Sequence, residues 1–243
     1  MNEYSLVSLD QLDGVRLLNR KDTKYVFNSL QIPELLDRLK SSYKVLSIQN
    51  EKQFNYKNLY FDTDDFIFFK QHHNEERSRY KVRLRNYSPS EDCYFEIKIK
   101  NNRNRTVKKR IKRHKVDFKK DHLLESEAEL LLRVVGFTPQ MISPKLSIEF
   151  SRITLVDNNF TERLTIDTGL KFISGKDYFS LENLAISEIK QEKYNVKSSY
   201  IQTLRSLKIP EMRFSKYCMG MINIYKNIKY NRFKEKQLYI NRI

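Results

Sequence analysis

The sequence predicts one α+β domain in which antiparallel strands dominate. Eight stretches have the composition of strands, and three others carry apolar residues at helical spacing. No internal repeat, low-complexity stretch or linker rich in Pro, Gly or Ser separates these elements. The chain has 243 residues, a length that suits one or at most two domains. A single domain is therefore the simplest interpretation.

Three segments are predicted to be helices. Residues 28–42 place several leucines on one face, begin with residues that can cap a helix, and carry Pro33 where a first turn tolerates it. Residues 121–135 repeat this apolar pattern, and Gly136 is a natural stop for a helix. Residues 197–207 form the third candidate.

The predicted strands follow one another along most of the chain. Each is a short run of apolar and β-branched or aromatic residues. They cover residues 54–62, 66–71, 78–87, 92–100, 105–113, 145–156, 161–173 and 184–191.

Composition excludes several classes of protein. No apolar run approaches the ~18 residues of a membrane span, and the N-terminus lacks the basic and apolar segments of a secretory signal. Cys93 and Cys218 are too few for a disulfide framework or a CxxC zinc site, so we expect reduced thiols and a cytoplasmic protein. The four histidines have no metal-ligand spacing with the cysteines.

The net charge is the first indication of function. The chain has 46 Lys and Arg residues against 30 Asp and Glu residues, which gives +16. A field of this size favours a polyanionic partner, whether a nucleic acid, an anionic membrane or a phosphate-rich molecule or polymer. Charge alone does not distinguish among these partners.

The basic residues follow the alternation of strands. In residues 79–85, the side chains at 79, 81, 83 and 85 are all cationic and share one face, while 80, 82 and 84 are apolar or aromatic and share the other. Residues 95–100, 106–112 and 163–168 alternate in a similar way. A sheet with one solvated face is the ordinary explanation of such a pattern.

The density of like charge favours a different explanation. Residues 98–120 contain twelve Lys or Arg residues and one acid, Asp117. Neighbours on one face of a strand lie only ~6.5–7 Å apart, so a row of cations repels itself unless something negative is close. The pattern therefore indicates a sheet face that holds an anion.

No common catalytic or nucleotide-binding motif accompanies this face. The segment from Gly169 to Asp177 departs from a phosphate-binding loop in spacing and in its last residue, and no GxGxxG, GxSxG or HExxH motif occurs. Neither a zinc finger nor an RNP-type aromatic motif indicates a specific nucleic-acid partner. Stacking of single-stranded bases on interspersed Tyr and Phe stays open.

A series of short motifs, in order, resembles one family. The series covers roughly residues 18–222, and its specificity lies in the order, since each motif is weak alone. It consists of RKDTKY at 20–25, LYFDT at 59–63, KVRLRNY at 81–87, FEIK at 95–98, VKKR at 107–110, FSR at 150–152, RLTIDT at 163–168, SEIK at 187–190 and FSKY at 214–217. The chain in this way resembles the vacuolar transporter chaperone (VTC) catalytic domain, the polyphosphate polymerase branch of the CYTH, or triphosphate tunnel, superfamily.

The resemblance implies a fold and an activity. The fold is an antiparallel eight-stranded β-barrel with helices packed outside, whose cationic side chains point into a tunnel. The activity is transfer of the terminal phosphoryl group of ATP to inorganic phosphate or a growing polyphosphate chain, with Mn²⁺ or Mg²⁺. Such a reaction asks the protein mainly to position phosphates and neutralise their charge, which suits Arg and Lys.

The resemblance also implies which residues form the site. Four would take a catalytic role, namely Lys24, Arg83, Arg85 and Lys216. Phosphate binding would involve Lys98, Lys108, Arg110, Arg152 and Arg163. Of these, Lys108 is ambiguous by one or two positions, and strand parity groups it with Arg110. Glu188 would hold the metal, although a lone Glu on a strand is more often solvated or salt-bridged.

One departure from the wider superfamily bears on the reaction. Tunnel triphosphatases open with Glu-x-Glu-x-Lys, and here the same register holds Arg20, Asp22 and Lys24. An arginine in place of the first carboxylate disfavours hydrolysis that depends on several metal-binding acids, and agrees with the polymerase branch.

The predicted boundary lies near the end of the chain. We expect residues 1–225 to form the tunnel domain and residues 226–243 a basic C-terminal tail with six basic residues and one acid. Two interpretations of the tail stay open. It is either a solvated basic helix end or a contact for an anionic membrane surface or for emerging polyphosphate.

Two alternatives to the polymerase remain. One is a tunnel triphosphatase that hydrolyses inorganic triphosphate or nucleoside triphosphate. The other is a non-catalytic module that binds polyphosphate or RNA.

Overall fold

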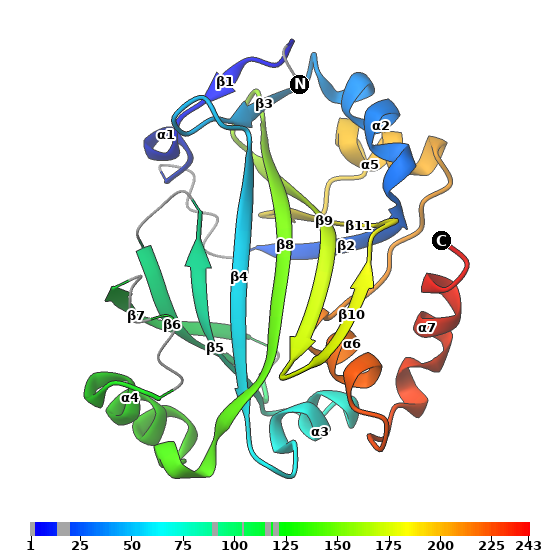
Figure 1. Cartoon of the computed structure of the whole chain (residues 1–243). Helices are drawn as coiled ribbons and strands as arrows, with labels where there is room; N and C mark the ends of the chain where they lie inside the picture. Colours follow the sequence, from blue (N-terminus) through cyan, green and yellow to red (C-terminus); the bar gives the residue numbers. More distant parts are fainter. Residues whose placement is uncertain (1–2, 14–19, 89–91, 104, 115–117, 119–121) are drawn as a thin grey trace.

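Long antiparallel strands form the centre of the molecule, and helices lie around them (Figure 1). The computed structural model describes residues 3–13, 20–88, 92–103, 105–114, 118 and 122–243. The strands are β1 (Leu6–Val7), β2 (Lys21–Asn28), β3 (Tyr43–Leu46), β4 (Gln53–Asp62), β5 (Arg79–Tyr87), β6 (Asp92–Lys100), β7 (Thr106–His114), β8 (Ser143–Asp157), β9 (Glu162–Ser174), β10 (Asp177–Leu181) and β11 (Leu184–Gln191). The helices are α1 (Leu9–Asp13), α2 (Ile32–Leu39), α3 (Ile67–His73), α4 (Glu125–Val135), α5 (Ser199–Ser206), α6 (Lys216–Ile224) and α7 (Lys234–Ile240).

Eight strands form one continuous antiparallel path. Its order is β2-β11-β9-β8-β4-β5-β6-β7, and β1, β3 and β10 pair beside it. The predicted α+β class and the eight antiparallel strands are confirmed. The path has two ends, β2 and β7, and no pairing joins them among the described residues, so the barrel is open at this seam.

The sheet is strongly curved, because side chains from distant parts of the path meet the same short segment. The Nζ of Lys24 on β2 donates to the carbonyl oxygen of Phe214 at 3.1 Å, and the Nζ of Lys81 on β5 donates to the hydroxyl of Ser215 at 3.1 Å. Four other strands, β11, β9, β8 and β4, lie between β2 and β5 along the path. The concave face therefore encloses a space lined by both halves of the sheet.

Three helices cover the convex face. α2 and α5 pack over β2, β9 and β11 in a core that includes Leu35, Leu164 and Leu204. α4 packs over β5 and β6 through Leu130 and Leu131. These cores bury the apolar side chains that alternate with the cations along the strands. This agrees with the expectation that helices pack outside the barrel.

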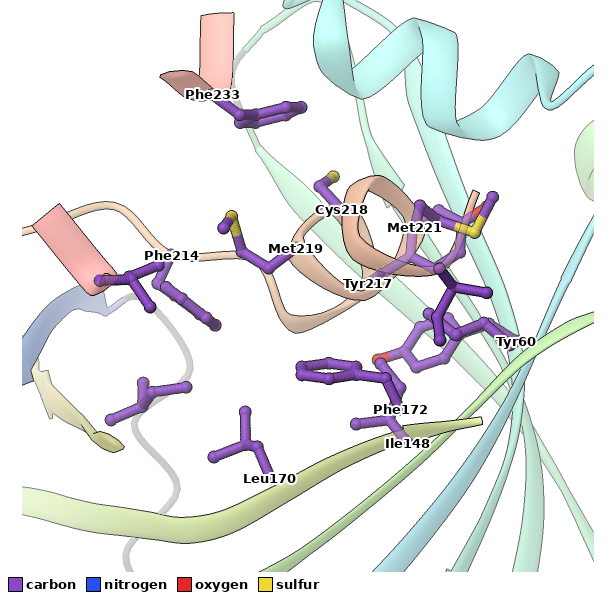
Figure 2. Packing of buried hydrophobic residues seen from close by; sticks show 14 of the residues in the cluster. Tyr60, Ile148, Leu170, Phe172, Phe214, Tyr217, Cys218, Met219, Met221 and Phe233 are labelled. Atoms are coloured by element: carbon purple, nitrogen blue, oxygen red, sulfur yellow. The ribbon is translucent and has the colours of Figure 1, made fainter. Parts of the chain in front are cut away.

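The helix α6 lies on the other, concave face. Figure 2 shows Tyr217, Met219 and Met221 of α6 above the strand residues Ile148 and Phe172, with Cys218 on the side toward Phe233 of the C-terminal segment. No helix was predicted at residues 216–224. The helix forms because Ser215 caps it by accepting a hydrogen bond from the backbone N–H of Cys218 at 3.3 Å.

Gly220 lets α6 approach the sheet closely. A Cβ atom at this position would lie 2.5 Å from a ring carbon of Phe172 and 2.6 Å from a methyl carbon of Leu146, both fully buried. We expect Gly220→Ala to destabilise the protein by about 1–2 kcal/mol, because the overpacking cost exceeds the gain in helix propensity. Chemical unfolding measures this, with Gln202→Ala at an exposed position of α5 as the control. An unchanged or raised stability of Gly220→Ala would contradict the close packing.

The prediction of a strand at residues 66–71 is wrong. Residues 67–73 form α3. The carboxylate of Asp62 accepts hydrogen bonds from the backbone N–H groups of Thr63, Phe68 and Phe69 at 2.8–2.9 Å, and the hydroxyl of Thr63 accepts one from Ile67 at 3.0 Å. These bonds satisfy the first N–H groups of a helix, so the chain turns into α3 although its Ile and Phe residues favour a strand.

The other predicted elements are present with small shifts in their ends. The first predicted helix begins as a 3-10 turn at Ser29–Gln31 and continues as α2, with the side chain of Asn28 as its cap. The predicted stop at Gly136 is confirmed, since this residue has a φ of 80° after α4. The strands β1, β2, β3 and β10 were not predicted. Residue 121, the start of the second predicted helix, lies outside the described residues.

The segment 226–243 packs against the rest of the chain. Phe233 and Ile240 are buried in the same core as α6, and the hydroxyl of Tyr239 donates to the carbonyl oxygen of Val26 at 3.1 Å. Among the described helices, none combines the length and the apolar character that crossing a membrane requires. Cys93 and Cys218 are both buried, and neither forms a disulfide.

Candidate functional site

Alternation along β5 puts its cations on the concave face of the sheet. Val82 and Leu84 are fully buried in the core beneath α4, whereas the side chains of Arg83 and Arg85 point the other way and are 18% and 14% exposed. Pairing with β6 and β7 continues the pattern sideways. Lys81, Lys98 and Lys108 form one row across the three strands, and Arg83, Glu96 and Arg110 form the next.

Arg83 is held by a buried acid and a tyrosine. Its guanidinium donates two hydrogen bonds to one carboxylate oxygen of Glu96, at 2.6 and 2.9 Å, and a third to the hydroxyl of Tyr60 at 2.9 Å. Burial alone raises the pKa of Glu96, but Arg83, Arg85 and Lys108 outweigh it and hold this pKa to about 2. Arg83 is therefore fixed in orientation before any ligand arrives.

The neighbouring Arg85 has a neutral partner. Its Nε donates to the amide oxygen of Asn58 at 2.8 Å, and its distance to Glu96 is 3.9 Å. Burial and the charge of Arg83 lower the pKa of Arg85. The positive charge of Arg85 is therefore only partly balanced by nearby acids, as expected of a group that binds an anion.

A second buried acid orders the opposite wall. The guanidinium of Arg152 on β8 binds both carboxylate oxygens of Asp167 on β9, one of them at 2.8 Å, and the ammonium of Lys216 binds the same carboxylate. Burial alone raises the pKa of Asp167, but Arg152 and Lys216 hold it well below its usual range. Burial in turn lowers the pKa of Lys216 to about 8.

Glu188 lies between two lysines. One carboxylate oxygen is 3.2 Å from the Nζ of Lys24 on β2, and the other contacts Lys190 on the same strand. Its side chain is 23% exposed, on the concave face. Arg163 is the cross-strand neighbour of Lys190, which brings it to the edge of this group.

Lys98 has no carboxylate partner among the described residues. Burial and the charges of Lys81, Lys24 and Arg83 lower its pKa to about 7. Its side chain is nevertheless accessible to solvent. The two properties agree if Lys98 lines a water-filled space enclosed by other cations, and the effect of Lys24 shows that β2 and β6 face each other across that space.

The pKa of Lys98 predicts a proton uptake. Lys98 is largely neutral above about pH 7 in the free protein, and a bound phosphate favours its charged form. We expect tripolyphosphate binding near pH 8 to take up protons, and affinity to fall as pH rises through 7–8, the pKa range of Lys98 and Lys216. Calorimetry in buffers of different ionisation enthalpy measures the uptake.

The matched variant for this test is Lys98→Met, which should lose part of the uptake. The sign for stability is opposite, because a base whose pKa falls on folding binds more protons when unfolded. Ligand-free stability should therefore rise with pH between about 7 and the normal lysine range. Binding without proton uptake in the wild type would contradict the enclosed position of Lys98.

Aromatic side chains extend the face beyond the arginines. The guanidinium of Arg110 lies 4.9 Å from the ring centre of Tyr94, which in turn contacts Tyr87 at 5.8 Å. The guanidinium of Arg152 lies 4.8 Å from the ring centre of Tyr56. Arg110 is exposed and lies farther from the buried acids than Arg83 does.

The structure thus brings the predicted residues onto one concave face, here called the tunnel face. Two further cations on it, Lys81 and Lys190, were not among the predicted site residues, although strand parity with Arg83 and Glu188 could have found them. Tyr60, Glu96 and Asp167 were also missed as partners. The tunnel face carries the cations Lys24, Lys81, Arg83, Arg85, Lys98, Lys108, Arg110, Arg152, Arg163, Lys190 and Lys216, and the acids Asp22, Glu96, Asp167 and Glu188.

The acids on this face offer little to a divalent metal. In the part of the chain that the structure describes, no three His, Cys, Asp or Glu side chains gather as a metal site would require. Glu96 and Asp167 are each engaged by arginine and lysine. Asp22 is paired with Arg20. Glu188 is more exposed than Glu96 and Asp167, and it fits a hard cation as a single protein ligand, with phosphate oxygens and water as the others.

Known structures of similar fold have little sequence in common with this chain. A protein from Bacillus halodurans named for adenylate cyclase matches with 14% identity and a TM-score of 0.56, over 86% of this chain and 100% of its own. A protein from Hippeastrum named for adenylyl cyclase, and described as having a dominant triphosphatase activity, matches with 13% identity and a TM-score of 0.54, over 86% of this chain and 99% of its own. At this identity the likeness shows the fold alone.

Family membership rests on the sequence. No curated protein matches the chain. The family model described as the VTC domain matches residues 19–225, most of the chain and every residue of the tunnel face. The expected family and the tunnel fold are thereby confirmed, and the chain belongs to the VTC domain family.

Proposed function

We propose that this protein is a metal-dependent polyphosphate polymerase, which transfers the terminal phosphoryl group of ATP to inorganic phosphate or to a growing polyphosphate chain on the tunnel face. The observation that carries the proposal is the arrangement of Arg83 and Arg152. Each is fixed by a buried carboxylate whose pKa is held low, on a face where cations outnumber acids. Family membership supports the same reaction.

The reaction needs little acid–base chemistry from the protein. The bond between the β- and γ-phosphates of ATP breaks, a terminal oxygen of the acceptor phosphate forms the new P–O bond, and ADP leaves. A terminal phosphate oxygen is already largely deprotonated near neutral pH, so a dedicated general base is not required. The protein must place acceptor and donor in line and balance the charge that spreads over the transferred group.

The residues divide this work according to their contacts. Arg83 and Arg85, side by side on one strand, suit two-pronged binding of the transferred phosphate. Lys24 and Lys216 reach the same space from β2 and α6. The remaining predicted phosphate ligands would hold the rest of the triphosphate and the chain, namely Lys98, Lys108, Arg110, Arg152 and Arg163.

Glu188 is the proposed ligand of Mn²⁺ or Mg²⁺. Such an ion, when bound, neutralises charge on the phosphate oxygens. Lys24 and Lys190 already contact this carboxylate, so it would exchange a lysine for the cation or share its oxygens with both. The cytoplasm remains the predicted location, and the proposed partners are ATP and phosphate or polyphosphate.

A product gel tests the proposal directly. Purified protein is incubated with ATP and Mn²⁺, and the products are resolved by length. A polymerase forms a ladder of long chains. Release of phosphate alone would replace the proposal by a tunnel triphosphatase, and the absence of both products would replace it by a non-catalytic binding module.

A further inference from the structure

A second cationic pocket lies beside α6, at the ends of β5, β6 and β7 where residues 79, 100 and 106 lie. It has a volume of about 220 Å³, and α3, the segment before α6 and the C-terminal segment complete its walls. We call it the α6 pocket. Its cations are Arg79, Lys81, Lys98, Lys100, Arg213 and Lys236.

The charge of this pocket is not balanced from within. Glu75 is the one acid among its lining residues, and the carboxylate of Glu75 faces Arg232 at 3.4 Å. Among the described residues, Lys100, Arg213 and Lys236 form no ion pair, in contrast to Arg83 and Arg152 on the tunnel face. Burial and the charges of Arg79 and Arg213 lower the pKa of Lys100, which places these cations close together.

The pocket and the tunnel face are continuous. Lys81 and Lys98 belong to both, and they stand next to the row that holds Arg83. Lys81 also donates to the hydroxyl of Ser215, another lining residue. A linear anion that starts at Arg83 and passes Lys81 and Lys98 therefore reaches Lys100 and Arg213 without leaving cationic surroundings.

The aromatic residues of the pocket do not suit nucleobases. Phe214 and Phe233 line it, but both rings are buried in the core around α6 (Figure 2). Base stacking requires an exposed ring face. The surroundings favour a chain of phosphates without bases over single-stranded RNA.

We propose that the α6 pocket is a chain-binding subsite, which holds the part of a polyphosphate chain that extends beyond the phosphates bound at Arg83 and Arg85. This inference rests on the proposed function for its ligand. The C-terminal segment contributes Lys236, a residue outside the family match at 19–225. The packing of Phe233 and Ile240 holds that lysine at the pocket, so the segment serves as a wall of the subsite.

The test compares ligands of two lengths on the full chain, without ATP and metal. Tripolyphosphate is short enough to be held at the arginines alone, whereas long-chain polyphosphate reaches both sites. We expect Lys100→Ala/Arg213→Ala/Lys236→Ala to weaken binding of the long chain at least about tenfold, in line with the loss of charge-assisted contacts. Binding of tripolyphosphate should stay within about twofold.

The matched control removes three exposed cations elsewhere, in Lys176→Ala/Lys193→Ala/Lys197→Ala. It changes the net charge equally and should bind the long chain as the wild type does. Three results would each overturn the subsite. The first is an equal loss of long-chain binding in both triple variants, and the second is an equal loss of tripolyphosphate binding in the pocket variant. The third is single-stranded RNA that binds with the same affinity as the long chain and is equally weakened by the pocket variant. Wild-type protein that binds long chains through the pocket but forms no polyphosphate from ATP would instead remove the proposed function alone.

Discussion

Arg85→Ala should lower the rate of polyphosphate formation by about 100-fold or more, the usual cost of removing one charge-stabilising group from a reaction centre. The fold should tolerate the change, because Arg85 donates to neutral Asn58 and is not the main partner of Glu96. Initial rates from ATP, together with thermal unfolding, measure the two effects separately.

Arg83→Ala should lower the rate of polyphosphate formation to a similar extent, and it should also lower the stability of the fold. The substitution removes the closest partner of Glu96, whose side chain is 1% exposed. Breaking a buried ion pair costs about 3–5 kcal/mol. Val82→Asp on the opposite face should unfold the protein, since Val82 is fully buried beneath α4. A variant Arg85→Ala with normal turnover, or a folded Val82→Asp, would show that the faces of β5 are wrongly assigned.

Glu188→Gln should separate metal dependence from phosphate binding. The substitution keeps the shape of the side chain and removes its charge, so tripolyphosphate should bind without metal at least as tightly as to the wild type. Turnover with Mn²⁺ should fall, with partial recovery at high metal concentration. Titrating Mn²⁺ against activity, and measuring bound Mn²⁺ in the presence of tripolyphosphate, gives two independent readings.

The ion pairs of Glu188 supply the competing explanation. Because the carboxylate contacts Lys24 and Lys190, a purely structural role predicts lower thermal stability and an unchanged metal midpoint. Lys24→Met is the useful companion, since it removes one partner and leaves the carboxylate. Near-normal turnover of Glu188→Gln with the same Mn²⁺ midpoint would exclude Glu188 as a metal ligand.

Local alternation explains why part of the site could be predicted from the sequence. Residues 79–85 place Arg83 and Arg85 opposite Val82 and Leu84 whatever the strand pairs with, because successive side chains of a strand point to opposite faces. Which face becomes concave does not follow from alternation. The resemblance to the VTC family supplied that choice.

Long-range pairing explains what could not be predicted. Glu96 meets Arg83, and Asp167 meets Arg152, only through the register of β5 with β6 and of β8 with β9. The helix α6 depends on the cap at Ser215 and on a Gly220 that fits beneath Phe172, and α3 depends on the carboxylate of Asp62. In each case a contact within the fold decides the structure against a weak or opposite local preference.

Calorimetry of tripolyphosphate and of AMP, repeated at rising salt, tests most directly whether the tunnel face binds a phosphate chain. The cations on this face come from both halves of the sheet, so several should contact a chain of phosphates at once and few can contact a single phosphate. We predict that tripolyphosphate binds at least about 100-fold more tightly than AMP, and that its affinity falls steeply with salt. Equal affinities for the two ligands, or an affinity for tripolyphosphate that does not change with salt, would contradict the account.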